Sequence, residues 1–182
     1  MYGQPGWASI LRMIRTFAIA ASAAAVFSGS AVASADPVGQ DGTVFAIGKC
    51  YDPSQAPVQR PASFDYNCNT TGVMKNMTWT AWDADGARGT GTDSSVECQP
   101  NCAQGTTLVN PIVVHAWNPV TSPSPACPQD IKFYSDLTIA YPKGAPPWIK
   151  PGTTWSPGTD FVTVDNMPAV HFSDLTPTCG PL

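Results

Sequence analysis

The sequence predicts an all-β fold, a small disulfide-stapled β-sandwich or partly open barrel with long proline-rich loops. Three observations predict it. From residue 36 onward the chain has 17 threonines and 12 valines but four leucines and one glutamate, and β-branched residues suit a pleated, half-buried surface. Eighteen prolines punctuate the same stretch, and proline breaks helix interiors. All six cysteines lie there too, an even number typical of a disulfide framework.

The first 35 residues have the three parts of a secretory signal peptide. Arg12 and Arg15 form a basic region, residues 17–27 form an uncharged apolar run, and small residues end in "ASA" at 33–35. The apolar run is far shorter than the roughly 20 residues that a membrane-spanning helix needs. We therefore expect residues 1–35 to be removed on export.

Residues 36–182 are expected to form one secreted domain, either released or retained at the cell surface. Loss of the leader leaves seven basic against thirteen acidic residues, a net charge of −6. An acidic surface argues against nucleic acid and anionic lipid as partners, and no later stretch is long and apolar enough to span a membrane. Translation could begin at Met1 or at Met13, because a short basic region suffices.

The expected strands follow from alternating polarity and from β-branched runs. In 75–82, for example, Met77 and Trp79 alternate with Thr78 and Thr80. The segment 142–158 has five prolines and two tryptophans and shows no recognisable repeat. The expected strands are 43–50, 75–82, 88–98, 106–117 and 131–141, with a short extended piece at 64–69 and a short pair within 161–172.

Turn residues and breakers refine this pattern. Asp83 to Gly86, "DADG", reads as a hairpin turn, because Asp-Gly readily supplies positive φ. The same residues resemble the start of a calcium loop, but no bidentate glutamate stands at the required offset. Gly89 and Gly91 mark a bulge or a close backbone approach. Pro111 cannot donate to a ladder and marks an edge or a bulge.

The six cysteines are expected to form three disulfides, since oxidising compartments favour them. Six cysteines allow 15 pairings, and the sequence does not choose among them. They are Cys50, Cys68, Cys98, Cys102, Cys127 and Cys179.

The pair in "CQPNCAQG", Cys98 and Cys102, is expected to act as a staple. A zinc site usually needs two close pairs, although His115 and His171 could complete four ligands, and a redox site typically has the tighter C-x-x-C at a helix start. A direct bond would close a five-residue loop, worth about 2 kcal/mol. We favour instead a long bridge between Cys68 and this turn.

The segments "MTWTAWDADGARGTGT", "CQPNCAQGT", "IVVHAW" and "FYSDLTIAYPKGAPP" resemble a family of small secreted actinobacterial, mycobacterial-like proteins. Its pattern is a W-x-x-W strand, an A-x-G-x-G segment, a C-x-P-x-C-A-x-G turn and an aromatic strand ending in T-x-x-Y-P. The match covers about 75–147, and Cys50, Cys127 and Cys179 are not part of the motif pattern. The resemblance implies secretion and a β-rich fold, and it carries over no catalytic residue.

Aromatic residues near the C-terminal end are candidate ligand-binding residues. Tyr141, Trp148 and Trp155, with several prolines nearby, could line a groove for a carbohydrate or a peptide, because aromatic faces stack on sugar rings and grip proline-rich chains. The alternative, which we favour, is that these rings cap the ends of the core.

The segment "HFSD" places His171 close to Ser173 and Asp174 and suggests a hydrolase. Such chemistry needs three groups that meet across the fold beside an oxyanion hole, and no G-x-S-x-G motif is present. His115, in an alternating strand, reads as a satisfied structural histidine.

These observations favour a secreted, non-catalytic binding or cell-envelope module over an enzyme, with an envelope glycan or protein as partner. We expect no cofactor and no metal. A small secreted hydrolase that uses His171 is the alternative.

Overall fold

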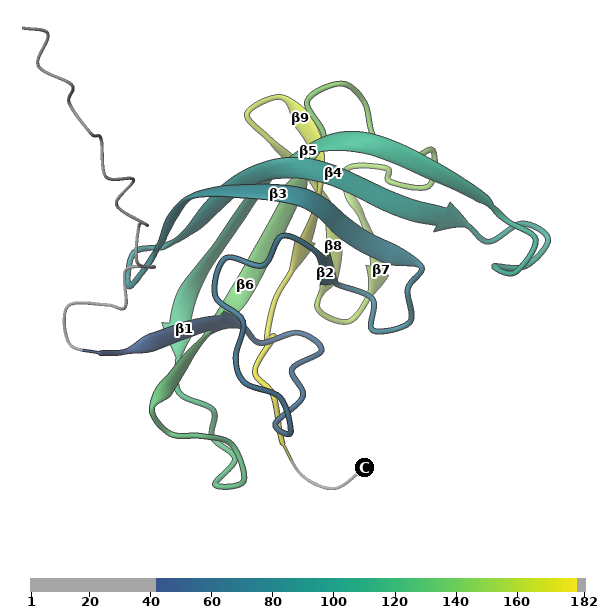
Figure 1. Ribbon diagram of the computed structural model, residues 1–182. Helices are drawn as coiled ribbons and strands as arrows, with labels where there is room; N and C mark the ends of the chain where they lie inside the picture. Colours follow the sequence, from purple (N-terminus) through teal and green to yellow (C-terminus); the bar gives the residue numbers. More distant parts are fainter. Residues whose placement is uncertain (1–41, 180–182) are drawn as a thin grey trace, which may run out of the picture. The chain divides into compact units, whose positions relative to one another are not determined.

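The computed structural model describes residues 42–179 (Figure 1). The expected signal peptide and the choice between Met1 and Met13 lie outside these residues. The described part contains no helix, and its strands match the predicted all-β fold. They are β1 (Val44–Ile47), β2 (Phe64–Asp65), β3 (Gly72–Asp83), β4 (Gly86–Glu97), β5 (Thr106–Val120), β6 (Ile131–Ala140), β7 (Thr153–Ser156), β8 (Thr159–Val164) and β9 (Met167–Phe172).

All nine strands belong to one sheet, in the order β2-β3-β4-β5-β6-β9-β8-β7. Neighbours in this order are antiparallel, whereas β1 pairs with the first half of β6 in parallel. Figure 1 shows that the sheet curls, so that β3, β4 and β5 arch over the side that carries β7 and β8. The fold is thus the partly open barrel of the two predicted architectures, with β2 and β7 as its edges.

The β3–β4 hairpin confirms the predicted turn. Asp83 pairs with Gly86, whose φ of +123° suits glycine, and the backbone N–H of Asp85 donates to the Asp83 carboxylate at 2.9 Å. The register shifts twice along β3, opposite Gly89 and Gly91. A Cβ at Gly89 would lie 2.8 Å from the Trp79 ring, so the predicted close approach is confirmed as well.

Pro111 lies in β5 where that strand has a single neighbour. It pairs with Thr92 of β4, but the ladder to β6 begins only at Val113. Since proline lacks the N–H that a ladder needs, its place at a local edge agrees with the prediction.

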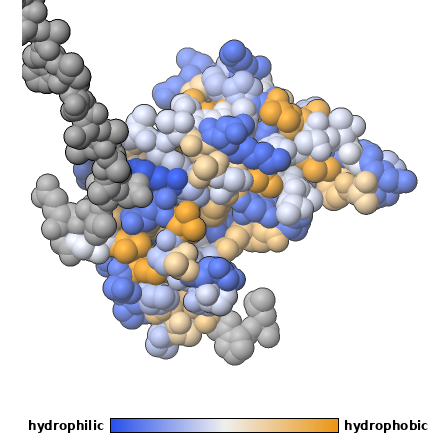
Figure 2. All heavy atoms as spheres, in the orientation of Figure 1, coloured by the Kyte–Doolittle hydropathy of each residue, from blue (hydrophilic) through white to orange (hydrophobic). Residues whose placement is uncertain are grey.

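The core fills the concave side of the sheet. Along β4 and β5, inward and outward residues alternate, as expected for a sheet with one buried face. A second, smaller cluster lies around Phe133 and Tyr51, whose rings meet edge to face at 4.8 Å. On the face shown in Figure 2, hydrophobic residues are scattered among hydrophilic ones. The largest fully buried side chains include Trp82, Tyr134, Tyr141, Phe133 and Met74.

The sequence predicted no strand within 142–158, but the structure has one there. Thr153–Ser156 form strand β7, which pairs with β8 through a turn at Gly158, where φ is +73°. The sequence signal was hidden because Pro151 and Pro157 flank a strand of four exposed residues, which shows no alternation of burial. This strand carries Trp155.

All six cysteines are paired, but the favoured bridge from Cys68 to the Cys98 turn is wrong. Cys68 bonds Cys50, and Cys98 bonds Cys102. The physical reason is local: β2 ends where the chain leaving β1 passes, with 5.4 Å between the Cα atoms of Cys50 and Cys68, while the β4–β5 connection folds back on itself.

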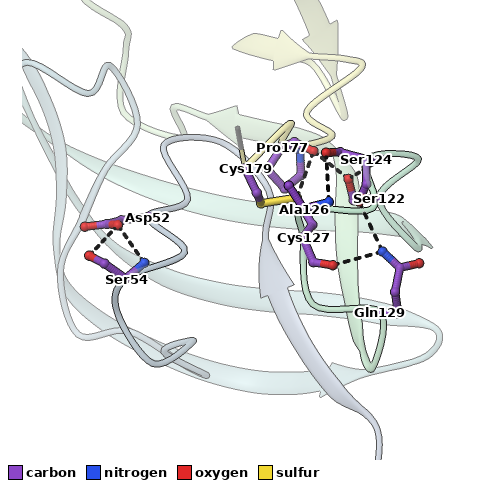
Figure 3. The surroundings of a disulfide bond; sticks show 9 residues. All are labelled: Asp52, Ser54, Ser122, Ser124, Ala126, Cys127, Gln129, Pro177 and Cys179. Atoms are coloured by element: carbon purple, nitrogen blue, oxygen red, sulfur yellow. Dashed lines mark hydrogen bonds between the residues drawn. A yellow bond between two sulfur atoms is a disulfide. The ribbon is translucent and has the colours of Figure 1, made fainter. Parts of the chain in front are cut away.

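The third disulfide, Cys127–Cys179, fastens the end of the described chain to the β5–β6 connection (Figure 3). The carbonyl of Pro177 accepts a hydrogen bond from the Ser122 hydroxyl at 2.6 Å, beside the bridge. Upstream, the N–H of Leu175 donates to the carbonyl of Ser135 at 2.9 Å. The bridge therefore secures a segment that also packs on the sheet.

Candidate functional site

A cavity of about 650 Å³ opens into the concave side of the curled sheet. One wall comes from the loop after β2 and the end of β4; the other comes from β7, β8, β9 and the segment 147–149. Its volume falls within the range of about 300–1,000 Å³ that is usual for small-molecule sites. Its lining residues are Tyr66, Asn67, Asn69, Thr71, Ser95, Val96, Glu97, Cys98, Gln99, Tyr141, Pro147, Trp148, Ile149, Trp155, Thr159, Phe161, Val170 and Phe172.

The structure brings together all three aromatic residues predicted to bind a ligand. Tyr141, Trp148 and Trp155 each line this cavity, which we call the aromatic cleft. Tyr141 is buried, Trp148 packs against the main core, and Trp155 is 68% exposed at the rim, 5.9 Å from the Phe161 ring. Tyr141 and Trp148 thus also contribute to the core, whereas Trp155 does not cap it.

A buried carboxyl group lies behind the cleft. Asp93, on β4, has no exposed surface, and it accepts hydrogen bonds from the hydroxyls of Tyr66 at 2.7 Å and Tyr141 at 3.0 Å. Tyr66, just after β2, and Tyr141, just after β6, both line the cleft. The carboxyl therefore links β4 to the segments after β2 and β6 through the two phenol groups.

Burial controls the protonation of this group of side chains. Loss of solvent raises the pKa of Asp93 above its ordinary value, while the hydroxyls of Tyr66 and Tyr141 act in the opposite direction. Burial raises the pKa of both tyrosines well above their ordinary value, and the next cause is the neighbouring Tyr141 for Tyr66 and the Asp93 carboxyl group for Tyr141. Both phenols consequently remain protonated donors across the physiological range.

Ser95 adds a polar group that has no hydrogen-bond partner. Its side chain lines the cleft and is only 5% exposed, and its hydroxyl lacks a partner among the described residues. The hydroxyl is close enough to Asp93 to lower the pKa of that carboxyl, although it does not satisfy hydrogen-bond geometry. An unpaired buried hydroxyl destabilises the folded state unless a ligand or a water molecule forms a hydrogen bond with it.

The rim near β2 is polar. Asn67, Asn69 and Thr71 are joined by short hydrogen bonds, including a 2.6 Å bond from the Thr71 hydroxyl to the Asn69 side chain. Glu97 is the only charged residue among the residues that line the cleft. The cleft therefore has one polar, negatively charged wall and one aromatic wall.

Sequence reasoning missed Tyr66, Asp93 and Ser95. Asp93 and Ser95 stand at alternate positions of β4 and so share its inner face with Glu97. The one available signal was this alternation, which places an aspartate where a strand buries its side chains. Nothing local connects it to Tyr66, 27 residues earlier, or to Tyr141, 48 residues later.

His171 lies away from the aromatic cleft, and its neighbours are not the predicted ones. Its Nδ1 is 3.1 Å from the Thr138 hydroxyl, and its Nε2 is 3.6 Å from the Asp136 carboxylate. Ser173 instead donates its backbone N–H to Gly158. The sequence-adjacent set His171, Ser173 and Asp174 is therefore not the one that the fold assembles.

Both histidines stack on one tryptophan. The Trp117 ring lies 4.6 Å from His115 and 5.3 Å from His171, nearly parallel to each. The expectation that His115 is satisfied is wrong, because its buried Nε2 has no partner among the described residues. Burial, and then the charge of Arg88, lowers the pKa of His115.

Within residues 42–179, no group of three or more His, Cys, Asp or Glu side chains could hold a metal ion. The same range has no helix of the length and hydrophobicity needed to cross a bilayer.

The chain was compared with protein-family models, with curated proteins and with solved structures, and none of them matches it.

Proposed function

We propose that this protein is a secreted, non-catalytic binding module of the cell exterior or envelope, and that its ligand lies in the aromatic cleft. One observation carries the proposal. Tyr141 directly after β6, Trp148 in the connection that follows and Trp155 in β7 all line a single cavity of about 650 Å³. A concave, mostly apolar pocket with a few convergent polar groups is the usual form of a ligand site.

Export is supported by the cysteine chemistry and by the leader pattern. Three disulfides pair all six cysteines, and disulfides persist mainly in oxidising compartments. Residues 1–35 have the composition of a signal peptide. The resemblance to small secreted actinobacterial proteins points the same way.

The test is a calorimetric titration of the oxidised protein with a panel of four probe classes. The panel holds a chitin oligosaccharide, a proline-rich peptide, a neutral phenol and an aromatic ammonium compound. We expect saturable binding of at least one probe, and loss of that binding in the double variant Trp148→Ala/Trp155→Ala. Trp117→Ala removes a tryptophan outside the cleft and serves as the matched control. Absence of saturable binding to every probe, or binding that the double variant retains, would overturn the proposal.

A second candidate function is a hydrolase centred on His171. The contacts of His171 favour it, because the imidazole lies between the Thr138 hydroxyl and the Asp136 carboxylate. It ranks second because Thr138 is buried and none of the three residues lines the aromatic cleft. Broad substrate profiling with His171→Ala as control tests it, and activity that this change abolishes would favour the hydrolase.

A further inference from the structure

The charge and the ring content of the aromatic cleft identify the kind of ligand that fits it. Six aromatic rings line the cleft, and they come from five strands or strand ends and the segment between β6 and β7. They are Tyr66, Tyr141, Trp148, Trp155, Phe161 and Phe172. The face of an aromatic ring carries partial negative charge and attracts cations.

The ionisable groups of the cleft have the same sign. Glu97 lines it, Asp93 lies directly behind two of its tyrosines, and neither lysine, arginine nor histidine is among its lining residues. An anionic ligand would therefore meet repulsion without a compensating partner. A cation would meet the Glu97 carboxylate and the ring faces.

One ring of the cleft already holds a cation of the protein itself. The Lys49 ammonium lies over the Phe172 ring, 4.6 Å from its centroid. Lys49 does not line the cleft. One of the rings that line the cleft is therefore in contact with a cation of the protein on one of its faces.

Polar side chains are regularly spaced along the inner face of β4. Asp93, Ser95 and Glu97 follow one another at alternate positions, and they run from the buried interior to the rim. The unpartnered Ser95 hydroxyl and the Glu97 side chain thus leave the same face of one strand, at backbone positions about 6.5 Å apart. A ligand that satisfies both would have a polar group and a positive charge at a similar separation.

We propose that the cleft binds an aromatic or apolar organic cation, an ammonium or quaternary ammonium compound that carries a hydroxyl or carbonyl group. The cation lies between Glu97 and the rings of Trp148 and Trp155, and the hydroxyl or carbonyl pairs with Ser95. This inference rests on the proposed function, because it assumes that the cleft is the binding site.

The test uses three probes that share a phenol ring and differ in the charge of the group opposite the hydroxyl. They are (4-hydroxyphenyl)trimethylammonium, its neutral isostere 4-tert-butylphenol, and 4-hydroxybenzenesulfonate, each titrated calorimetrically into the oxidised protein. We expect the cation to bind about tenfold more tightly than the neutral isostere, and the sulfonate to give no measurable binding.

Variants connect the selectivity to named groups. Glu97→Gln should weaken binding of the cation about fivefold and leave the affinity for the neutral isostere unchanged. Ser95→Ala should weaken both by a similar factor, because both probes carry the hydroxyl. Asp85→Asn removes an exposed carboxylate in the β3–β4 turn and should change neither.

The outcomes separate this inference from the proposed function. Equal affinity for the cation and the neutral isostere, or unchanged selectivity in Glu97→Gln, would overturn the proposal that the ligand is a cation and would leave the cleft as a binding site. Tighter binding of the saccharide or the peptide of the wider panel would overturn the cation proposal in the same way. Failure of all probes would overturn both proposals.

Discussion

The Tyr66 hydroxyl donates a 2.7 Å hydrogen bond to Asp93, a carboxyl group with no exposed surface. The bond joins the segment after β2 to the inner face of β4, and the Tyr141 hydroxyl, just after β6, donates to the same carboxyl group at 3.0 Å. A buried carboxyl of this kind couples the stability of the cleft to pH, since its ionised form is costly in the folded state.

Asp93 should make the protein less stable as pH rises. Its pKa is raised on folding, so the folded state retains a proton that the unfolded chain has lost above the ordinary aspartate pKa. Across the interval between these two pKa values, the free energy of unfolding should fall by up to about 1.4 kcal/mol per pH unit. Asp93→Asn should flatten that decline, as measured by urea denaturation at a series of pH values.

The control for this prediction is Asp85→Asn, which removes an exposed carboxylate of the β3–β4 turn. It should keep the pH dependence of the unmodified protein. Stability that rises with pH across the same interval, and does so less in Asp93→Asn, would show that Asp93 is held ionised instead.

The three disulfides should differ in their contribution to stability. Loss of Cys127–Cys179, which spans 52 residues, should lower the free energy of unfolding by about 4 kcal/mol, and loss of Cys98–Cys102, which spans four, by about 2 kcal/mol. The reason is that a longer loop restricts the unfolded chain more. Paired Cys→Ala variants and urea denaturation measure both values. A larger loss for the short loop would refute this order.

Gly89→Ala should destabilise the β3–β4 hairpin by about 1–3 kcal/mol. The new Cβ would lie 2.8 Å from the Trp79 ring and 2.9 Å from the Thr78 carbonyl oxygen. The ring cannot easily move away, because its indole N–H donates to the Pro61 carbonyl at 2.9 Å and it packs against the Trp82 ring in a T-shaped contact. Thermal denaturation beside Thr90→Ala, an exposed neighbour, gives the measurement. Equal melting temperatures for the two variants would contradict the close contact.

Much of the sheet was predictable from local pattern. The alternation around Met77 and Trp79 and the "DADG" turn sufficed to place the β3–β4 hairpin. Strand β7 was not predictable in this way, because its four residues are exposed between two prolines and only the ladder to β8 makes them a strand.

The candidate site likewise has residues that were predictable from the sequence and residues that were not. Aromatic composition alone indicated Tyr141, Trp148 and Trp155. The Asp93 network depends on contacts between residues 27 and 48 positions apart, and the cysteine pairing depends on where β1 and β2 end. Such long-range relations follow from the curl of the sheet, which no local signal encodes.

The most direct test of the central claim, that the aromatic cleft is the binding site, is to follow the indole N–H signals of isotopically labelled protein during a titration by nuclear magnetic resonance. With the tightest-binding probe of the panel, the account predicts saturable shifts of the Trp148 and Trp155 signals. The signals of Trp79 and Trp82 should stay in place, because their N–H groups are bonded to the carbonyls of Pro61 and Phe45. A shift confined to Trp117, with Trp148 and Trp155 unchanged, would contradict it.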